Sequence, residues 1–208
     1  MSKIKLPKSI KMVVTDFDGV ITDNCVYINE DFSMSRKLNF KDIMGFFLLK
    51  RNGIDISIIS GEKNSAIETM AQKFQITEIH QNIRIKIDVL KDILKKYNLS
   101  QEEYVYIGDD VNDLECLNFA KYKITVPHAV EKVKNVDKIQ ITQSEAGNGA
   151  FREVADCLPL FIHIEPPYIG VVIWMLGFPF FLCFLIRFFQ FPTSSMYSLA
   201  AFRFSKNL

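Results

Sequence analysis

Short apolar runs rich in β-branched residues alternate along the chain with longer segments in which apolar positions recur every three or four residues. The first kind predicts buried strands, and the second predicts amphipathic helices. Strands are expected at residues 11–16, 54–60, 78–80, 103–110, 123–126 and 138–142. Helices are expected at residues 42–53, 65–74, 86–98, 113–120, around 130 and at 150–158. This alternation predicts a mostly parallel central sheet covered on both faces, a Rossmann-like α/β sandwich.

One segment, residues 25–40, interrupts the alternation. Its sequence, CVYINEDFSMSRKLNF, has two extended arms around Asn29, Glu30 and Asp31, which favour a turn. We therefore expect a β-hairpin that projects as a flap and is too short to form a domain of its own.

The charge of the chain changes sharply near residue 156. The chain holds 25 Lys+Arg and 24 Asp+Glu, but the only charges after this point are Glu165, Arg187, Arg203 and Lys206. The same stretch carries more than half of the 18 Phe and the single Trp. We therefore expect a folded domain at residues 1–160 and an apolar tail at 161–208. The net charge of +1 predicts no nucleic-acid partner.

The tail contains no charged residue from Tyr168 to Ile186, a stretch long enough to cross a bilayer as a helix. Three interpretations stay open: a membrane anchor at 168–186, a non-functional extension from an altered reading frame, and a helix buried in an oligomer. The basic residues that follow the stretch would keep the C-terminus in the cytosol and place the folded domain outside. A cytosolic enzyme does not fit that orientation.

The cysteines and the N-terminus indicate the compartment. The four cysteines are scattered without a CxxC pair, which favours reduced thiols: Cys25, Cys116, Cys157 and Cys183. The basic start MSKIKLPKSIK lacks the apolar segment of a signal peptide. We expect a cytoplasmic protein, with membrane association possible through the tail.

Carboxylates follow the predicted strands at the points where these strands end. Asp16 and Asp18 follow the first strand, Ser60 ends the second, and Asp109 and Asp110 end the strand YVYIG. The carboxyl ends of parallel strands share one edge of the sheet, where ligands bind. Taken singly, each aspartate is better explained as part of a turn or a helix cap, and Ser60 as part of a turn. Their joint placement predicts a site.

The residue types at this edge suit phosphoryl transfer. Asp16 can attack phosphorus to form an aspartyl-phosphate, and Asp18 can protonate the leaving oxygen and later deprotonate water. Mg²⁺, held by Asp16 and Asp109, would offset the repulsion between these carboxylates and a phosphate.

Three further residues complete this predicted site. Ser60 and Lys86, which begins the helix at 86–98, would orient the transferring oxygens. Gly19 would let the backbone turn tightly beside the phosphate.

Four segments at these positions resemble the motifs of the haloacid dehalogenase superfamily of phosphatases: DFDGVITD, ISG, Lys86 and GDDVND. The segments LNFKDIMG and GNGAFREVAD are similar to the 3-deoxy-manno-octulosonate 8-phosphate phosphatases and their nonulosonate 9-phosphate relatives. This resemblance covers residues 9–160. It implies an α/β HAD sandwich without a cap domain, a bound Mg²⁺ ion and a homotetramer. The intervals after the first strand and before Lys86 are indeed too short for a cap.

The resemblance also implies residue roles. Asp16 is the nucleophile and Asp18 the acid/base, and the main-chain carbonyl of Asp18 is a metal ligand beside Asp16 and Asp109. Asp110 and Asp113 support these ligands. The substrate would be contacted by Asp18, Gly19, Gly61, Glu62 and Lys73.

Substrate choice depends on a few of these positions. Glu62 and Lys73 resemble the nonulosonate branch, where the octulosonate branch usually shows Arg in place of Glu62. Met70 stands where both branches commonly have Arg, and Asn82 replaces a usual Gly. We expect a sugar acid phosphate of one of these two kinds.

Two other classes of protein compete with an enzyme. A non-catalytic assembly domain, similar to that of sialate cytidylyltransferases, shares the fold but typically lacks catalytic groups, which are present here. A signalling receiver domain also has a doubly wound sheet and an acidic pocket. Receivers place an adjacent acidic pair near the first strand, whereas this chain has the Asp16-x-Asp18 spacing.

Overall fold

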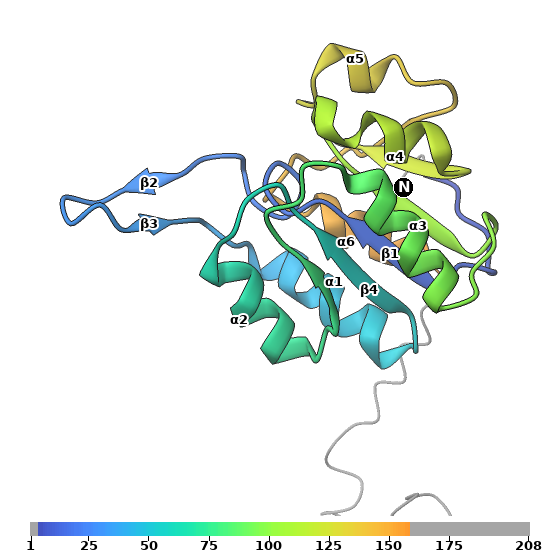
Figure 1. Cartoon of the computed structure of the whole chain (residues 1–208), viewed down its shortest axis with the longest axis horizontal. Helices are drawn as coiled ribbons and strands as arrows, with labels where there is room; N and C mark the ends of the chain where they lie inside the picture. The colour runs from blue at the N-terminus through green and yellow to red at the C-terminus, as the bar shows by residue number, and fades with distance from the viewer. Residues whose placement is uncertain (1–3, 159–208) are drawn as a thin grey trace, which may run out of the picture. The chain divides into compact units, whose positions relative to one another are not determined.

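The computed structural model describes residues 4–158. Six parallel strands form the central sheet in the order β5-β4-β1-β6-β7-β8. Their bounds are β1 Met12–Thr15, β4 Asp55–Ile59, β5 Glu78–His80, β6 Tyr104–Ile107, β7 Tyr122–Thr125 and β8 Gln140–Ile141. This architecture confirms the predicted Rossmann-like sandwich (Figure 1).

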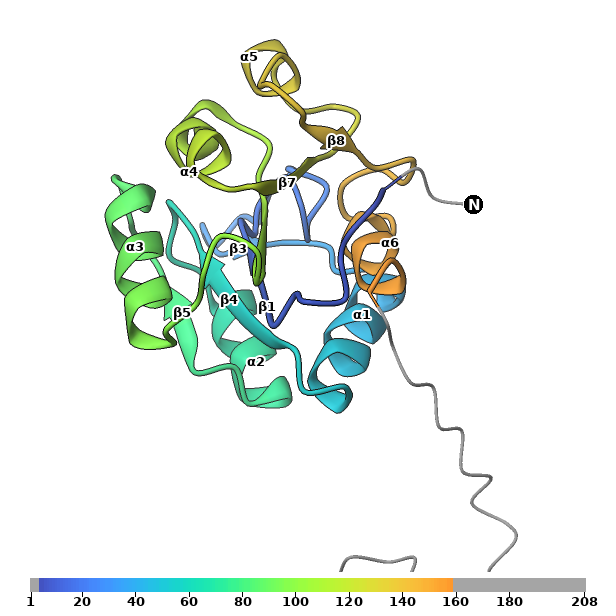
Figure 2. The same cartoon turned by 90° about the vertical axis from the view of Figure 1, so that its right-hand side faces the viewer.

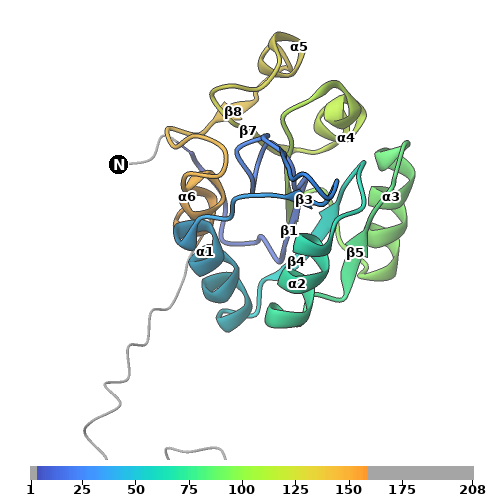
Figure 3. The ribbon, with the colours of Figure 1, turned by 90° about the vertical axis from the view of Figure 1, so that its left-hand side faces the viewer.

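Helices cover both faces of the sheet, and each face has its own apolar core. One face carries α1 Phe40–Arg51, α2 Ser65–Phe74 and α6 Ala150–Asp156. The other face carries α3 Lys86–Lys96, α4 Leu114–Phe119 and α5 Glu131–Lys134, with the short 3-10 helix η1 Val111–Asp113 before α4. The two layers are visible on opposite sides of the sheet in Figure 2 and Figure 3. Neighbouring residues of the strands alternate between the two cores, as the pleat requires.

Polar caps fix where the helices beside the carboxyl ends of the strands begin. The Asn64 side chain accepts a hydrogen bond from the Ile67 N–H and starts α2. Asp110 and Asp113 form a capping box around η1. These caps satisfy N–H groups that a helix start leaves without partners.

The predicted hairpin is present but its ladder is short. Only β2 Tyr27–Ile28 and β3 Met34–Ser35 pair, in antiparallel register, and the hairpin extends away from the sheet (Figure 1). Within residues 4–158, no helix combines the length and the apolar character that crossing a membrane requires. The predicted tail at 161–208, with its segment at 168–186, lies outside the described residues.

Candidate active site

A pocket of about 510 Å³ opens at the carboxyl ends of β1, β4 and β6. Seven of the residues that line it were predicted from the sequence: Asp16, Asp18, Ser60, Gly61, Glu62, Asp109 and Asp110. Five were not: Asn24, Asn82, Ile83, Arg84 and Asn112. The structure therefore brings together most of the predicted residues, which come from three separate stretches of the chain.

Five buried polar side chains form the floor of this pocket: Asp16, Ser60, Lys86, Asp109 and Asp113. The Lys86 side chain is fully buried, and its Nζ lies 2.7 Å from Asp16 Oδ2 and 2.9 Å from Asp113 Oδ1. Asp113 also accepts hydrogen bonds from the Tyr106 hydroxyl at 2.7 Å and from the N–H groups of Asp109 and Asp110 at 3.2 and 3.4 Å. Four donors thus occupy the Asp113 carboxylate, which positions Lys86 and the loop after β6.

Burial and neighbouring charges also shift the pKa values of the charged side chains in the floor. Burial, followed by the Asp113 charge, raises the pKa of Asp16 well above its ordinary value. Burial and the charges of Asp113 and Asp110 raise the pKa of Asp109 to about 7. Burial alone would lower the pKa of Lys86, but the charges of Asp113 and Asp16 outweigh it and raise that pKa. The single positive charge of Lys86 cannot balance three neighbouring carboxylates, so the site favours binding of a further cation.

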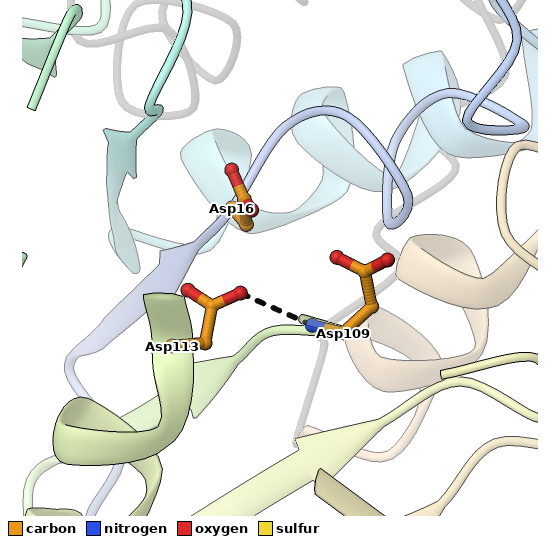
Figure 4. A group of neighbouring side chains, drawn as sticks. All are labelled: Asp16, Asp109 and Asp113. Carbon is orange, nitrogen blue, oxygen red and sulfur yellow. Dashed lines mark hydrogen bonds between the residues drawn. The ribbon is translucent and has the colours of Figure 1, made fainter. Parts of the chain in front are cut away.

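The carboxylates of Asp16, Asp109 and Asp113 converge, with oxygen atoms within 4.8 Å of one another (Figure 4). Asp113 is occupied by its four donors, so Asp16 and Asp109 are the side chains that could hold a metal ion. Asp109 Oδ1 is buried and, within residues 4–158, has no hydrogen-bond partner. An oxygen-only donor set with a buried oxygen of this kind fits Mg²⁺.

Gly19 explains how Asp109 can approach β1 so closely. A Cβ atom at residue 19 would lie 2.1 Å from Asp109 Oδ2, and the residue has φ +84°. Both the contact and the backbone angle exclude a larger residue. The predicted importance of Gly19 thus has a structural cause: it leaves space for Asp109 rather than for the phosphate alone.

Asp18 lies at the edge of the pocket and is held by residues that the sequence did not reveal. Its Oδ1 accepts hydrogen bonds from the Thr22 hydroxyl at 3.0 Å and from Arg36 Nε at 2.8 Å. Asn64 Nδ2 lies 3.5 Å from Oδ2. Arg36 follows β3, so the hairpin contributes a side chain to the site. Its 18-residue separation from Asp18 gave no sequence signal.

The remaining predicted residues divide between the pocket and the outer surface. Ser60 is buried at the end of β4, and its Oγ accepts a hydrogen bond from the Glu62 N–H at 3.2 Å. Lys73 lies near the far end of α2, above the ring of Phe74, and does not line the pocket. Met70 lies on α2 and is buried in the apolar core.

Comparison with known proteins agrees with this geometry. The model of the haloacid dehalogenase-like hydrolase family matches residues 22–154. The chain belongs to this family of hydrolases and is a phosphatase.

Three similar proteins illustrate how closely the chain resembles known phosphatases. The 3-deoxy-D-manno-octulosonate 8-phosphate phosphatase of Escherichia coli K12 is 27% identical over 154 residues, which cover 74% of this chain and 81% of that protein. A solved structure of the Moraxella catarrhalis enzyme of the same name, in complex with magnesium, phosphate and KDO, has a TM-score of 0.68 and 28% identity. That match covers 81% of this chain and 94% of the other. A probable YrbI family phosphatase from Pseudomonas syringae has a TM-score of 0.69 and 33% identity, covering 72% and 85%.

Proposed function

We propose that the chain hydrolyses the phosphomonoester of a keto-deoxy sugar acid phosphate, either a nonulosonate 9-phosphate or 3-deoxy-manno-octulosonate 8-phosphate. The observation that carries this proposal is the placement of Asp16 at the bottom of the open pocket, bonded to Lys86 and beside Asp109, with Asp18 at the edge. Two of the relatives described above, from Escherichia coli and Moraxella catarrhalis, are named for the eight-carbon sugar acid phosphate, which supports this class of substrate.

The reaction proceeds in two displacements. An Asp16 carboxylate oxygen forms a bond to phosphorus while the ester bond breaks, and Asp18 gives a proton to the departing sugar oxygen. Asp18 then takes a proton from water as that water attacks the phosphorus of the aspartyl-phosphate. Inorganic phosphate leaves, and both aspartates return to their initial state.

The other residues of the floor hold the reacting groups in place. Asp16, Asp109 and the main-chain carbonyl of Asp18 would hold Mg²⁺, which would supply positive charge against the phosphoryl oxygens. Lys86 and the Ser60 hydroxyl contribute further positive charge and a hydrogen bond to the same oxygens. Asp113 keeps Lys86 directed at Asp16, and Arg36 keeps Asp18 directed into the pocket.

A second copy of the chain is proposed to cover the hairpin, as part of a homotetramer. The described part of the chain has no cap domain over the pocket, and the hairpin beside it carries exposed apolar side chains, among them Ile28 and Phe32. Exposed apolar clusters of this kind mark interaction surfaces. The neighbouring copy would restrict the pocket to small substrates.

The test is release of phosphate from a panel of octulosonate and nonulosonate phosphates, with and without Mg²⁺. We expect turnover of at least one keto sugar acid phosphate, loss of turnover in EDTA, and better recovery with Mg²⁺ than with Ca²⁺, whose looser coordination misplaces the attacking carboxylate. A non-catalytic assembly domain would release phosphate from none of them. Undiminished turnover in EDTA would remove the metal from the mechanism.

A further inference from the structure

Among the described residues that line the pocket, Arg84 is the only one with a basic side chain. Five carboxylic acids line the same pocket: Asp16, Asp18, Glu62, Asp109 and Asp110. The other lining residues are uncharged, so among the described lining residues an anionic substrate meets a cationic side chain only at Arg84. This charge distribution makes Arg84 a candidate for contact with an anionic group of the substrate.

The chain around Arg84 is held firmly against the site. Arg84 lies in the loop between β5 and α3, and the Ile83 N–H donates to the Ser60 carbonyl at 3.0 Å. Asn82 has φ +58°, a left-handed conformation that Asn tolerates better than most residues. The loop thus fixes the Arg84 backbone beside the ends of β4 and β5.

Arg84 differs from the other two cations near the pocket because its guanidinium is not engaged. Lys86 is bonded to Asp16 and Asp113, and Arg36 is bonded to Asp18. Arg84 is exposed, and within residues 4–158 it has neither a hydrogen bond nor an ion pair. Of these three cations, only Arg84 can bind a second anionic group without breaking an existing contact.

We propose that Arg84 binds the carboxylate of the substrate and so selects phosphate esters that carry a second negative charge; this inference rests on the proposed function. The phosphate of such a substrate lies at Asp16, on the floor, and its carboxylate lies at the opposite end of the molecule. A guanidinium matches a carboxylate with two parallel N–H donors. Met70, which stands where related enzymes have Arg, is buried and cannot supply this contact.

The experiment compares two substrates that differ only in this charge: 3-deoxy-manno-octulosonate 8-phosphate and its C1 amide. The variants are Arg84→Ala, Arg84→Lys and the control Lys95→Ala, which removes an equal charge from the exposed surface of α3 outside the pocket. Arg84→Ala is expected to lower the ratio of kcat/KM for the acid over the amide about 10- to 100-fold, the range for a lost hydrogen bond between charged groups. Arg84→Lys should lower it less, and Lys95→Ala should leave it unchanged.

Each alternative outcome has a distinct meaning. If the wild-type chain hydrolyses the acid well and Arg84→Ala leaves the ratio unchanged, the inference is wrong while the proposed function stands. If Arg84→Ala lowers kcat/KM equally for acid and amide, Arg84 acts on the phosphoryl group instead and the inference is overturned. If the wild-type chain hydrolyses p-nitrophenyl phosphate but no keto sugar acid phosphate, the proposed substrate class fails and the inference fails with it.

Discussion

The floor of the pocket and the β2–β3 hairpin differ in how their side chains are covered. On the floor, Lys86 and Asp113 are fully buried, and each has partners within the same chain. On the hairpin, Phe32 is 87% exposed and Ile28 70% exposed. The floor is therefore complete in a single chain. The exposed apolar side chains of the hairpin would gain stability if a second surface removed them from water.

Local contacts alone give the hairpin little stability. Two residues on each arm pair, and the turn is held by hydrogen bonds from the Ser33 N–H and hydroxyl to Asp31. An isolated two-stranded hairpin is at best marginally stable in water. The Arg36–Asp18 ion pair at its base ties the hairpin to the site, so a second copy that covered the hairpin would also affect Asp18, the proposed acid/base residue.

The largest effect is expected on the floor, from Asp16→Asn. This change keeps the side-chain volume but removes the proposed nucleophile, which is also a proposed metal ligand, so kcat should fall on the order of 10⁴-fold or more. Steady-state phosphate release measures the loss, and circular dichroism checks that the fold is retained. A folded variant with normal turnover would exclude the covalent mechanism.

The next effect tests the hairpin. The double change Ile28→Asp and Phe32→Asp places charges on the apolar surface and is expected to convert the assembly into monomers, because buried unpaired charges are strongly unfavourable. Light scattering after gel filtration measures the mass. Ile141→Asp, at a residue of β8 that is 40% exposed, is the control and should leave the mass unchanged. A wild-type chain that is itself monomeric would contradict the proposed homotetramer.

A smaller loss is expected from Asp113→Asn, which keeps the shape but removes the charge that positions Lys86. Residues that orient metal ligands typically contribute about 10- to 100-fold to activity. The apparent Mg²⁺ affinity should weaken as well, because Asp113 accepts hydrogen bonds from the loop that carries Asp109. Titration of activity with Mg²⁺ measures both effects. An unchanged Mg²⁺ dependence would show that the loop keeps its position without Asp113.

The raised pKa values of Asp109 and Asp16 also predict how stability depends on pH when no metal is bound. The pKa of Asp109 is raised to about 7 in the folded chain, from an ordinary value of 3.8. Between these values the folded state binds more protons than the unfolded state, so the free energy of unfolding falls as the pH rises. The pKa of Asp16 is raised too and acts in the same direction.

In EDTA, the free energy of unfolding should therefore fall between pH 5 and 7, by an amount on the order of a few kcal/mol or less. The melting temperature, which is the quantity measured, should fall with it. Asp109→Asn should flatten this dependence, and Mg²⁺ should restore stability most at the higher pH. A melting temperature that rises across this window would contradict the raised pKa values.

The sequence could predict the floor better than the edge of the pocket, for a physical reason. Asp16, Ser60 and Asp109 follow directly on strands, and the parallel arrangement brings strand ends together whatever the loops do. Arg36 and Arg84 lie in irregular segments, whose paths depend on contacts such as Ile83 with Ser60. No periodicity in the sequence encodes those paths.

The smallest effect is expected at Glu62, on the exposed edge of the pocket. The Glu62 N–H donates to Ser60 Oγ, which holds the Glu62 backbone beside the pocket that this residue lines. We expect the wild-type chain to prefer nonulosonate 9-phosphate, because Glu62 can accept hydrogen bonds from sugar hydroxyls. Glu62→Ala should reduce this preference about 3- to 10-fold, the range for one hydrogen bond exposed to solvent, without the collapse in kcat expected for Asp16→Asn.

Comparison of kcat/KM for the two sugar acid phosphates measures the change, with Glu62→Gln as the matched variant that retains a hydrogen-bond acceptor. The contrary outcome is a wild-type chain that prefers the eight-carbon phosphate, with Glu62→Ala leaving that preference unchanged. That result would show that the Glu62 carboxylate contributes nothing to discrimination and that other residues determine substrate choice.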